Sequence, residues 1–446
     1  MAAVVRLTWR KWRKAREGAP RKGAAHCYPA SSIDHVWSFQ GVCVKVACVG
    51  GGPAGLYLSI LLKLQDPSHD VTVLERNPEG STYGWGVTYW QGLLDKLRAR
   101  DPESARAIEE HSVVWNQGVA HVRDLSTRQP GDEGHGIGRH KLLEILAERA
   151  RALGVRLEFE CAVTADDLPE ADLVVAGDGV HSALRTRYAD HFGAELAPGR
   201  NSYVWLGTSK VFDSFTFAFV ETEHGWIWCY GYPFSTAQST CVIECAPETC
   251  AGLGLDRASE TDGLVQLEKL FAHILDGHPL IGRATADGSS PWLTFRTLTN
   301  RTWYRDNLVL LGDAAHTTHY SIGAGTTLAL EDSLALADAL AGGDGLPQAL
   351  ARYEHERRTA LLPQQSAARL SAQWYENLAR YIDLPPERMF ALLGQRHSPL
   401  LPYVPPQLYY RLDRAAGQLD ALRRLKRWLG PKIARSAHTR AQAARK

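Results

Sequence analysis

Three glycines interrupt an apolar stretch near the start of the chain, VACVGGGPAGLYLSILL at residues 46–62. The pattern Gly-x-Gly-x-x-Gly between a strand and a helix is typical of dinucleotide binding. Gly50 permits a tight turn, Gly52 lets the backbone approach a pyrophosphate, and Gly55 lets the helix and strand pack closely. The free N–H groups at the start of the helix attract phosphate. We therefore assign a phosphate site to Gly50, Gly52, Pro53, Ala54 and Gly55.

An acidic residue ends the next apolar segment, DVTVLE, where Glu75 stands 25 residues after Gly50. A carboxylate at this place accepts hydrogen bonds from ribose hydroxyls and repels a 2′-phosphate. This favours FAD or NAD over NADP as the bound dinucleotide, with Glu75 and the adjacent Arg76 at its adenosine end.

Two later motifs favour FAD over NAD. Asp178 follows the apolar run DLVVAG, and Asp313 follows NLVLLG much further along the chain. An NAD site needs no such late element, whereas FAD extends its ribityl chain and isoalloxazine across the molecule, where a carboxylate can bind the ribityl hydroxyls. The helix start after Asp313 can direct N–H groups at the flavin N1–C2 carbonyl. Its candidate residues are Gly323, Gly325 and Thr326.

Hydrophobic periodicity indicates the elements that place these residues. We expect a βαβ unit from a strand at 44–49, a helix at 53–63 and a strand at 70–75. The segment 202–245 is aromatic and alternates with a period of two, which predicts antiparallel strands. Further helices are expected at 139–153, at 323–341 and over 346–430.

These elements predict an α/β fold. It consists of a Rossmann-like FAD/NAD(P)-binding domain of the glutathione reductase type, an inserted antiparallel β-sheet substrate domain and a helical C-terminus. The expected domains are a basic, disordered extension at 1–40, an FAD-binding domain at 41–198 and 295–345, a β-sheet substrate domain at 199–294, and a C-terminal helical region with a basic tail at 346–446.

Composition excludes several classes of protein. Hydrophobic residues make up 45% and charged residues 22% of the 446 residues, as in ordinary globular proteins. The net charge of +1 argues against nucleic-acid binding, and no apolar run is long enough for a transmembrane helix. Eight cysteines without CxxC or zinc spacing predict no metal site and a cytoplasmic location. A monomer and a homodimer both stay open.

The three motifs resemble those of the single-component FAD-dependent aromatic hydroxylases, typified by 4-hydroxybenzoate hydroxylase. The resemblance implies that the glycines bind the pyrophosphate and that Glu75 binds the adenosine ribose. It also implies that Arg139, in GRHKLLEIL, contacts FAD, that Asp178 belongs to a motif shared by FAD and the nicotinamide, and that Asp313 binds the ribityl chain.

Longer segments resemble one branch of this family. YGWGVTYWQGLLDKLRARDP and GDAAHTTHYSIGAGTTLALEDSLALA are similar to salicylyl-CoA 5-hydroxylase, to the monooxygenase part of 2-aminobenzoyl-CoA monooxygenase/reductase and to the tryptophan hydroxylase of violacein biosynthesis. Tyr320 fits the branch. The segment 230–233, YGYP, lacks the branch's histidine and cation, and Thr327 replaces a lysine of the CoA-using members, so the substrate is not carried over.

The resemblance implies the chemistry of a monooxygenase. NADH or NADPH reduces FAD, O2 forms a C4a-hydroperoxide on the flavin, and an electron-rich aromatic ring is hydroxylated while water is excluded. We expect the substrate to be an aminobenzoate or hydroxybenzoate thioester of CoA or of a carrier protein. A free tryptophan-like or indole compound is the alternative.

Tyr320 and His319 are the candidate active-site residues, because they precede the turn that faces the flavin. Trp85, Tyr232 and Phe234 are candidates for the substrate wall, although aromatic residues on strands more often form core. A flavin reductase or oxidase and a non-catalytic binding protein are the rival functions. Asp313 and Glu75 argue against the second.

Overall fold

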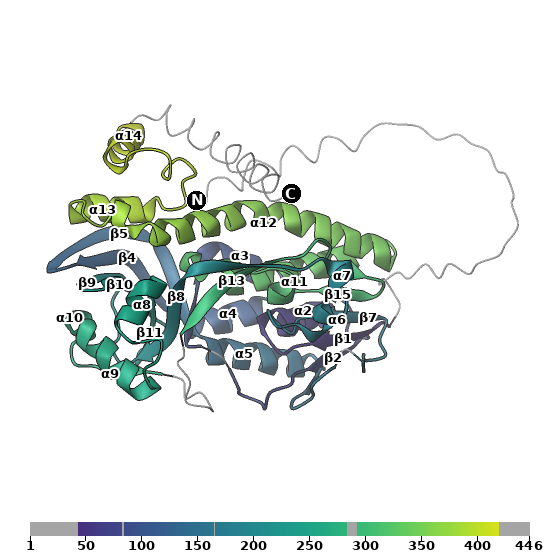
Figure 1. The fold of residues 1–446 in the computed structure, drawn as a ribbon. Coiled ribbons are helices and arrows are strands. Elements are labelled where there is room, and N and C mark those ends of the chain that lie inside the picture. Colours follow the sequence, from purple (N-terminus) through teal and green to yellow (C-terminus); the bar gives the residue numbers. More distant parts are fainter. Residues whose placement is uncertain (1–42, 83, 165, 283–291, 419–446) are drawn as a thin grey trace, which may run out of the picture. The chain divides into compact units, whose positions relative to one another are not determined.

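The computed structural model describes residues 43–418 apart from 83, 165 and 283–291. The expected basic extension at 1–40 and the tail beyond 418 lie outside these residues. The described part of the chain forms two β-sheets and the helices that cover them (Figure 1). This mixed α/β architecture confirms the predicted fold class.

The first sheet has six strands in the order β14-β15-β7-β1-β2-β6. Its neighbours pair in parallel except for β14 and β15. Short apolar segments such as KVACV and LVVA form its centre, because strands covered on both faces need side chains without polar groups. The strands are β1 (Lys45–Val49), β2 (Asp70–Leu74), β6 (Arg156–Glu158), β7 (Leu173–Ala176), β14 (Tyr304–Arg305) and β15 (Leu308–Leu310).

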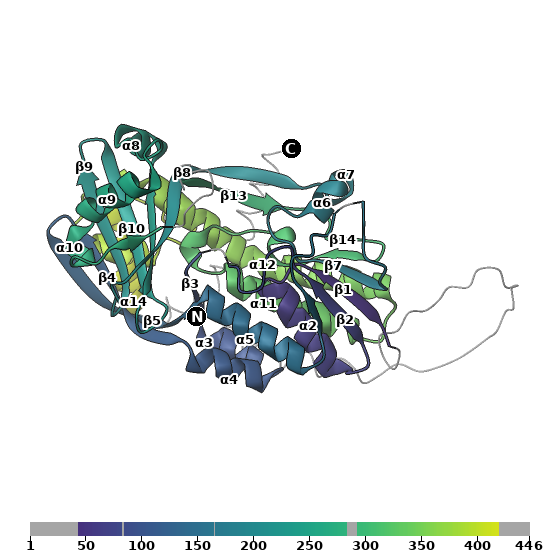
Figure 2. The ribbon, with the colours of Figure 1, turned by 90° about the horizontal axis from the view of Figure 1, so that it is seen from below.

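Helix α2 (Pro53–Gln65) packs against this sheet and contacts α5 (Arg139–Ala152) and α11 (Gly325–Leu340), as Figure 2 shows. Eleven residues of α2 in succession, Pro53–Lys63, are buried, so this helix is covered on all sides. The late helix α11 therefore lies beside the first βαβ unit, which brings the two ends of the expected FAD-binding domain together. Smaller helices on this side are α3 (Gln91–Arg98), α4 (Pro102–Glu110), α6 (Ala183–Arg187) and α7 (Ala189–Phe192).

The second sheet has the strand order β12-β8-β11-β10-β9-β4-β5-β3, with β13 paired to β8. Three of its strands come from 86–138, within the segment expected in the FAD-binding domain; the domain boundaries stay a prediction. The strands are β3 (Gly86–Trp90), β4 (Val113–Val122), β5 (Leu125–Gly138), β8 (Glu195–Thr208), β9 (Phe215–Thr222), β10 (Gly225–Pro233), β11 (Ser239–Cys245), β12 (Leu280–Ile281) and β13 (Leu293–Thr299).

Alternation divides the second sheet into two buried faces. On strand β10, Trp228 and Tyr230 point to one core, whereas Ile227 and Cys229 point to another. The second of these cores is closed by α8 (Pro247–Gly252), α9 (Glu260–Leu270) and α10 (Ala272–Leu275). The first is aromatic and meets the C-terminal helices.

One long helix, α12 (Leu346–Glu376), runs past both sheets (Figure 1) and packs into the core of the first sheet and the aromatic core of the second. Its first half buries Leu350 and Tyr353 in the core of the first sheet, and its end buries Trp374 and Tyr375 in the aromatic core of the second. Two shorter helices follow, α13 (Pro386–Gly394) and α14 (Pro406–Gln418). None of the helices within residues 43–418 is long and apolar enough to cross a membrane.

Candidate active site

The glycine turn after β1 has the geometry that the motif predicts. Gly50 has a φ of +108°, and a side chain there would lie 2.4 Å from the Gly177 carbonyl. A side chain at Gly55 would lie 2.2 Å from the Gly50 carbonyl, so strand, turn and helix are in backbone contact. Nothing in the described residues, apart from the neighbouring backbone, lies within 4 Å of a side chain built on Gly52, and no side chain caps α2. The start of α2 therefore faces open space at Gly52, and no described side chain occupies its first N–H groups.

The Glu75 carboxylate lies against this turn. Its Oε2 accepts a hydrogen bond from the Gly51 N–H at 2.7 Å, and its Oε1 accepts from the Asn77 backbone N–H at 2.9 Å. These bonds hold the carboxylate beside the glycines, where a ribose next to a pyrophosphate is expected. Arg76 follows it and is exposed.

The two later aspartates lie at the same edge of the first sheet as the glycine turn. Ala176 of β7 pairs with Val49 of β1 and with Leu310 of β15, all in parallel. Asp178 and Asp313 follow these strand ends, as Gly50 does. Since ligands of open α/β sheets bind at the carboxyl ends of parallel strands, one ligand can reach all three segments.

Asp313 and Arg139 lie close enough for their charges to interact. The Asp313 side chain is accessible to solvent, yet the surrounding protein raises its pKa by desolvation, while the charges of His316 and Arg139 oppose this. Burial lowers the pKa of Arg139, and Asp313 opposes that shift. The sequence predicted both residues as FAD ligands, and the structure brings them together.

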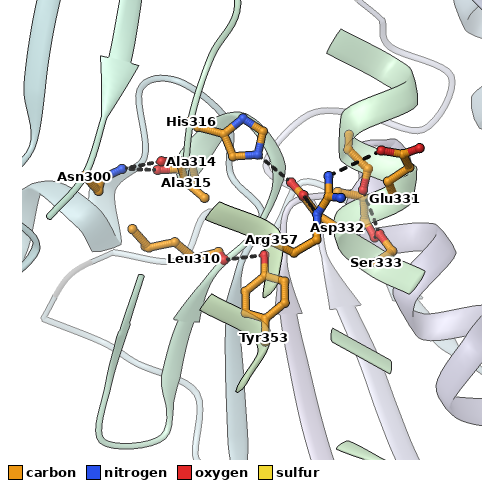
Figure 3. Close-up of polar contacts among 12 residues, drawn as sticks. Asn300, Leu310, Ala314, Ala315, His316, Glu331, Asp332, Ser333, Tyr353 and Arg357 are labelled. Carbon is orange, nitrogen blue, oxygen red and sulfur yellow. Dashed lines mark hydrogen bonds and ion pairs between the residues drawn. The ribbon is translucent and has the colours of Figure 1, made fainter. Parts of the chain in front are cut away.

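A buried network holds the loop that carries Asp313 (Figure 3). His316 Nε2 bonds to Asp332 Oδ2 at 2.8 Å, and Arg357 Nε donates to Asp332 Oδ1 at 2.7 Å. Burial would raise the pKa of Asp332, but the charges of His316 and Arg357 lower it. The Asn300 amide donates to the Ala314 and Ala315 carbonyls at 3.2 and 2.6 Å. Helices α11 and α12 thus fix the loop through side chains that the sequence did not single out.

The residues along this edge fit FAD. Arg139 Nε, Asp178 Oδ1 and Thr327 Oγ1 are buried polar atoms without a hydrogen-bond partner in the described residues. Buried polar groups are normally satisfied, so a ligand with hydroxyls and a polar ring is the expected partner. At the start of α11, nothing in the described residues lies within 4 Å of a side chain built on Gly325, and the neighbouring Thr326 is half-buried. Gly323 ends the preceding turn with a φ of +60°.

Tyr320 and His319 lie where the turn that precedes α11 meets the second sheet. The Tyr320 ring centroid is 4.3 Å from that of His319, 4.4 Å from that of Tyr203 and 6.3 Å from that of Tyr230. Burial lowers the pKa of His319 to about 4, so its imidazole is neutral at pH 7. Its Nδ1 bonds to Ser321 Oγ at 2.8 Å, which shapes the turn.

The other predicted wall residues lie on a different part of the sheet. Tyr232 donates its hydroxyl to the Gly86 carbonyl at 2.9 Å, and Phe234 packs onto the same glycine. Trp85 packs against Gly207 of β8, and its carbonyl accepts from the Arg139 N–H at 2.8 Å. Trp85 therefore lies between the start of α5 and strand β8 of the second sheet. A contact of these three residues with substrate stays a prediction.

Sequence reasoning missed a buried carboxylate beside Tyr320. Glu244 is 1% exposed, and it accepts hydrogen bonds from Tyr230 and Asn201. An acidic residue in the otherwise apolar strand STCVIEC was a usable signal, because a buried charge requires partners.

Three curated proteins illustrate what this chain is similar to. It is 38% identical to salicyloyl-CoA 5-hydroxylase of Streptomyces sp over 78% of this chain and 69% of that protein. It is 34% identical to 3-hydroxy-4-methyl-anthranilyl-[aryl-carrier protein] 5-monooxygenase of Streptosporangium sibiricum, over 79% of this chain and 94% of that protein. It is 30% identical to protodeoxyviolaceinate monooxygenase of Chromobacterium violaceum, over 83% of this chain and 100% of that protein.

Solved structures share the fold. The 2-methyl-3-hydroxypyridine-5-carboxylic acid oxygenase superposes with a TM-score of 0.62 at 19% identity, over 80% of this chain and 97% of that one. PqsL of P. aeruginosa gives a TM-score of 0.60 at 20% identity, over 76% and 99%. The family model described as FAD binding domain matches residues 43–363, so the chain belongs to this FAD-binding family.

Proposed function

We propose that the protein is an FAD-dependent monooxygenase that hydroxylates an electron-rich aromatic ring, with O2 and NADH or NADPH as co-substrates. The ring is an aminobenzoate or hydroxybenzoate bound as a thioester to CoA or to a carrier protein. The observation that carries the proposal is the convergence of Gly50, Glu75, Asp178 and Asp313 on one sheet edge. Next to it lies the turn whose Tyr320 contacts Tyr203 and Tyr230, two residues of the second sheet that we call the aromatic wall.

The residues of this chain divide the work. The glycine turn binds the pyrophosphate, Glu75 the adenosine ribose, and Asp313 with Arg139 the ribityl end. Bound FAD supplies the activation of O2 once a reduced nicotinamide has reduced it. Tyr320 and the aromatic wall position the substrate ring and exclude water, which would otherwise divert the reaction to hydrogen peroxide.

Two relatives support a thioester substrate by their names, an aryl-CoA hydroxylase and an aryl-carrier-protein monooxygenase. The third, named for protodeoxyviolaceinate, keeps a free indole-type substrate as the second candidate. The seven cysteines in the described residues are free thiols, which supports a location in the cytoplasm. The proposed assembly is a monomer or a homodimer.

The test is a substrate panel with the FAD-loaded protein. Salicyloyl-CoA, 2-aminobenzoyl-CoA, their free acids, tryptophan and indole are each tested for stimulation of NADH and NADPH oxidation, and products are analysed after reaction under ¹⁸O2. We expect a thioester to stimulate oxidation most and to gain one labelled oxygen. Stimulated oxidation without label in any product would show a flavin oxidase or reductase instead.

A further inference from the structure

Glu244 occupies an unusual place for a carboxylate, in the aromatic face of the second sheet. In the strand register it pairs with Tyr203 of β8 and with Trp228 of β10. Residues on the same face of β9 and β10, such as Phe217 and Trp228, are buried aromatic side chains. Glu244 itself is 1% exposed. A carboxylate is costly to bury, so its partners decide what it does there.

Two hydrogen bonds fix the Glu244 side chain. Oε1 accepts from the Asn201 amide at 2.7 Å, and Oε2 accepts from the Tyr230 hydroxyl at 2.6 Å. The Tyr230 oxygen in turn accepts from Trp228 Nε1 at 3.0 Å. Burial raises the pKa of Glu244, and these bonds oppose the shift. A carboxylate offers about four acceptor positions, so there is room for another donor.

Tyr320 supplies a donor without a partner. Its hydroxyl is buried and makes no hydrogen bond in the described residues. Its ring lies 6.3 Å from that of Tyr230, which donates to Glu244, and 4.4 Å from that of Tyr203, which pairs with Glu244 in the strand register. Burial and the nearby Glu244 raise the pKa of the Tyr320 hydroxyl. The backbone of the turn is held separately, since Arg396 donates to the Ser321 carbonyl at 3.0 Å. Catalytic hydrogen bonds are often long before the substrate binds and tighten afterwards.

We propose that Glu244 is a positioning residue for the hydroxylation, which orients the Tyr320 hydroxyl toward the substrate and takes up its proton. The inference rests on the proposed function. The hydroxyl of a hydroxybenzoate, or the iminium that an amino group becomes as the ring is attacked, gives its proton to the Tyr320 oxygen, and the Tyr320 proton passes to Glu244. One proton moves along this path, and no covalent bond to the protein forms. The proton leaves Glu244 by the reverse path after product release.

The groups around Glu244 are compatible with this role. The titratable side chains that face it are Tyr230 from β10, Tyr320 from the turn and Tyr375 from α12, and all three are neutral phenols with raised pKa values. Tyr203 faces Tyr320 from β8. The guanidinium of Arg396 acts on Tyr375, but it donates to the carbonyls of Ser321 and Leu393. Glu244 is thus the group in this cluster that can accept a proton.

Glu244→Gln tests the inference, because the amide keeps the shape and removes the acceptor of a proton. The FAD-loaded variant and wild type are compared with salicyloyl-CoA and 2-aminobenzoyl-CoA from pH 5 to pH 9. We expect about 100-fold slower hydroxylation, the size of a general-base contribution, with unchanged FAD content and unchanged flavin reduction by the nicotinamide. In wild type the rate falls as the pH drops and Glu244 is protonated; in the variant this acidic limb is absent.

Tyr320→Phe provides a second variant that removes only the hydroxyl. It should lose the same acidic limb, and the double variant should be no slower than either single one, because the two groups act in series. Glu248→Gln is the matched control, since Glu248 lies on α8 with its side chain exposed and paired to Arg200. It should keep the wild-type rate and pH profile.

The outcomes separate the inference from the proposed function. If wild type hydroxylates neither thioester nor any other compound of the panel, both are wrong. If wild type is active and Glu244→Gln keeps its rate and its acidic limb, only the role of Glu244 is wrong. If Glu244→Gln does not fold, a full acidic limb in Tyr320→Phe would overturn the inference.

Discussion

The flavin edge and the aromatic wall meet at one turn but are built in different ways. At the carboxyl edge of the first sheet, which we call the flavin edge, backbone geometry places the key residues: Gly50, Glu75, Asp178 and Asp313 each stand within three residues after a parallel strand, and glycines there permit close contacts. At the wall, side chains from neighbouring antiparallel strands create the environment, so register determines which groups meet. On the proposed function, the first region would bind the cofactor through local motifs, and the second would contact the substrate through residues that strand pairing brings together.

The largest effect is expected at the flavin edge from Gly52→Asp. The new side chain has open space, and aspartate is a favourable helix N-cap, so the protein should fold at least as stably as wild type. Its charge would repel the pyrophosphate, and the affinity for FAD should fall more than about 1,000-fold, a loss of roughly 4 kcal/mol. Fluorescence titration of the apoprotein with FAD measures this. Gly92→Asp, at an open position of α3, is the control and should bind FAD normally.

The network behind Asp313 should give the next largest effect. Asp332→Asn removes the carboxylate shared by His316 and Arg357 and leaves Arg357 only Glu331, at 3.5 Å; breaking such a buried pair typically costs about 3–5 kcal/mol. We expect this loss in the free energy of unfolding by urea, together with weaker FAD binding. Asp338→Asn, at an exposed pair on the same helix, should change stability by less than about 1 kcal/mol. If both variants lost the same free energy of unfolding, the buried network would be no more important for stability than an exposed ion pair.

On the wall side, Tyr320→Ala should leave FAD bound and uncouple the reaction. Removing the ring opens the turn next to Tyr203 to water, so reduced flavin should yield hydrogen peroxide in place of product. We expect the ratio of hydroxylated product to oxidised nicotinamide to fall about 10-fold, with NAD(P)H oxidation maintained. A wild-type ratio would place Tyr320 outside the active site.

The smallest effect concerns His319 and pH. Its folded pKa of about 4 lies below the ordinary value of 6.5, so the unfolded chain binds a proton more readily as the pH falls. His319 therefore destabilises the folded protein below pH 6.5, by about 1 kcal/mol between pH 7 and pH 5.5. His319→Asn, which can keep the cap of the turn, should show a stability that falls less over this interval. Parallel pH curves would contradict the assignment.

The flavin edge could be predicted from sequence because its signals are contiguous. Gly50, Glu75 and Asp313 each end an apolar run, and the strands at 44–49 and 70–75 were expected within one residue of β1 and β2. Glu244 was missed because its meaning depends on Tyr230, Asn201 and Tyr320, which belong to three other segments. No local pattern encodes that arrangement.

Two other parts of the chain show where periodicity is insufficient. Strand β5 has the sequence LSTRQPGDEGHGIG, with glycine, proline and charges, and it was not expected as a strand. Its pairing with β3 and β4 overrides its weak local preference. The helices expected over 346–430 are interrupted before Pro386 and Pro406. A proline has no N–H for a helix interior, so the double prolines at these places were a signal for new helix starts.

Helix α12 connects the two regions that, on the proposed function, bind the cofactor and the substrate. Its 31 residues extend about 46 Å, with one end fixed among the side chains behind Asp313 and the other fixed behind Tyr230. Pro363 lies inside this helix, where a proline removes one backbone hydrogen bond and favours a bend, so a substitution there would shift one end relative to the other without touching either site.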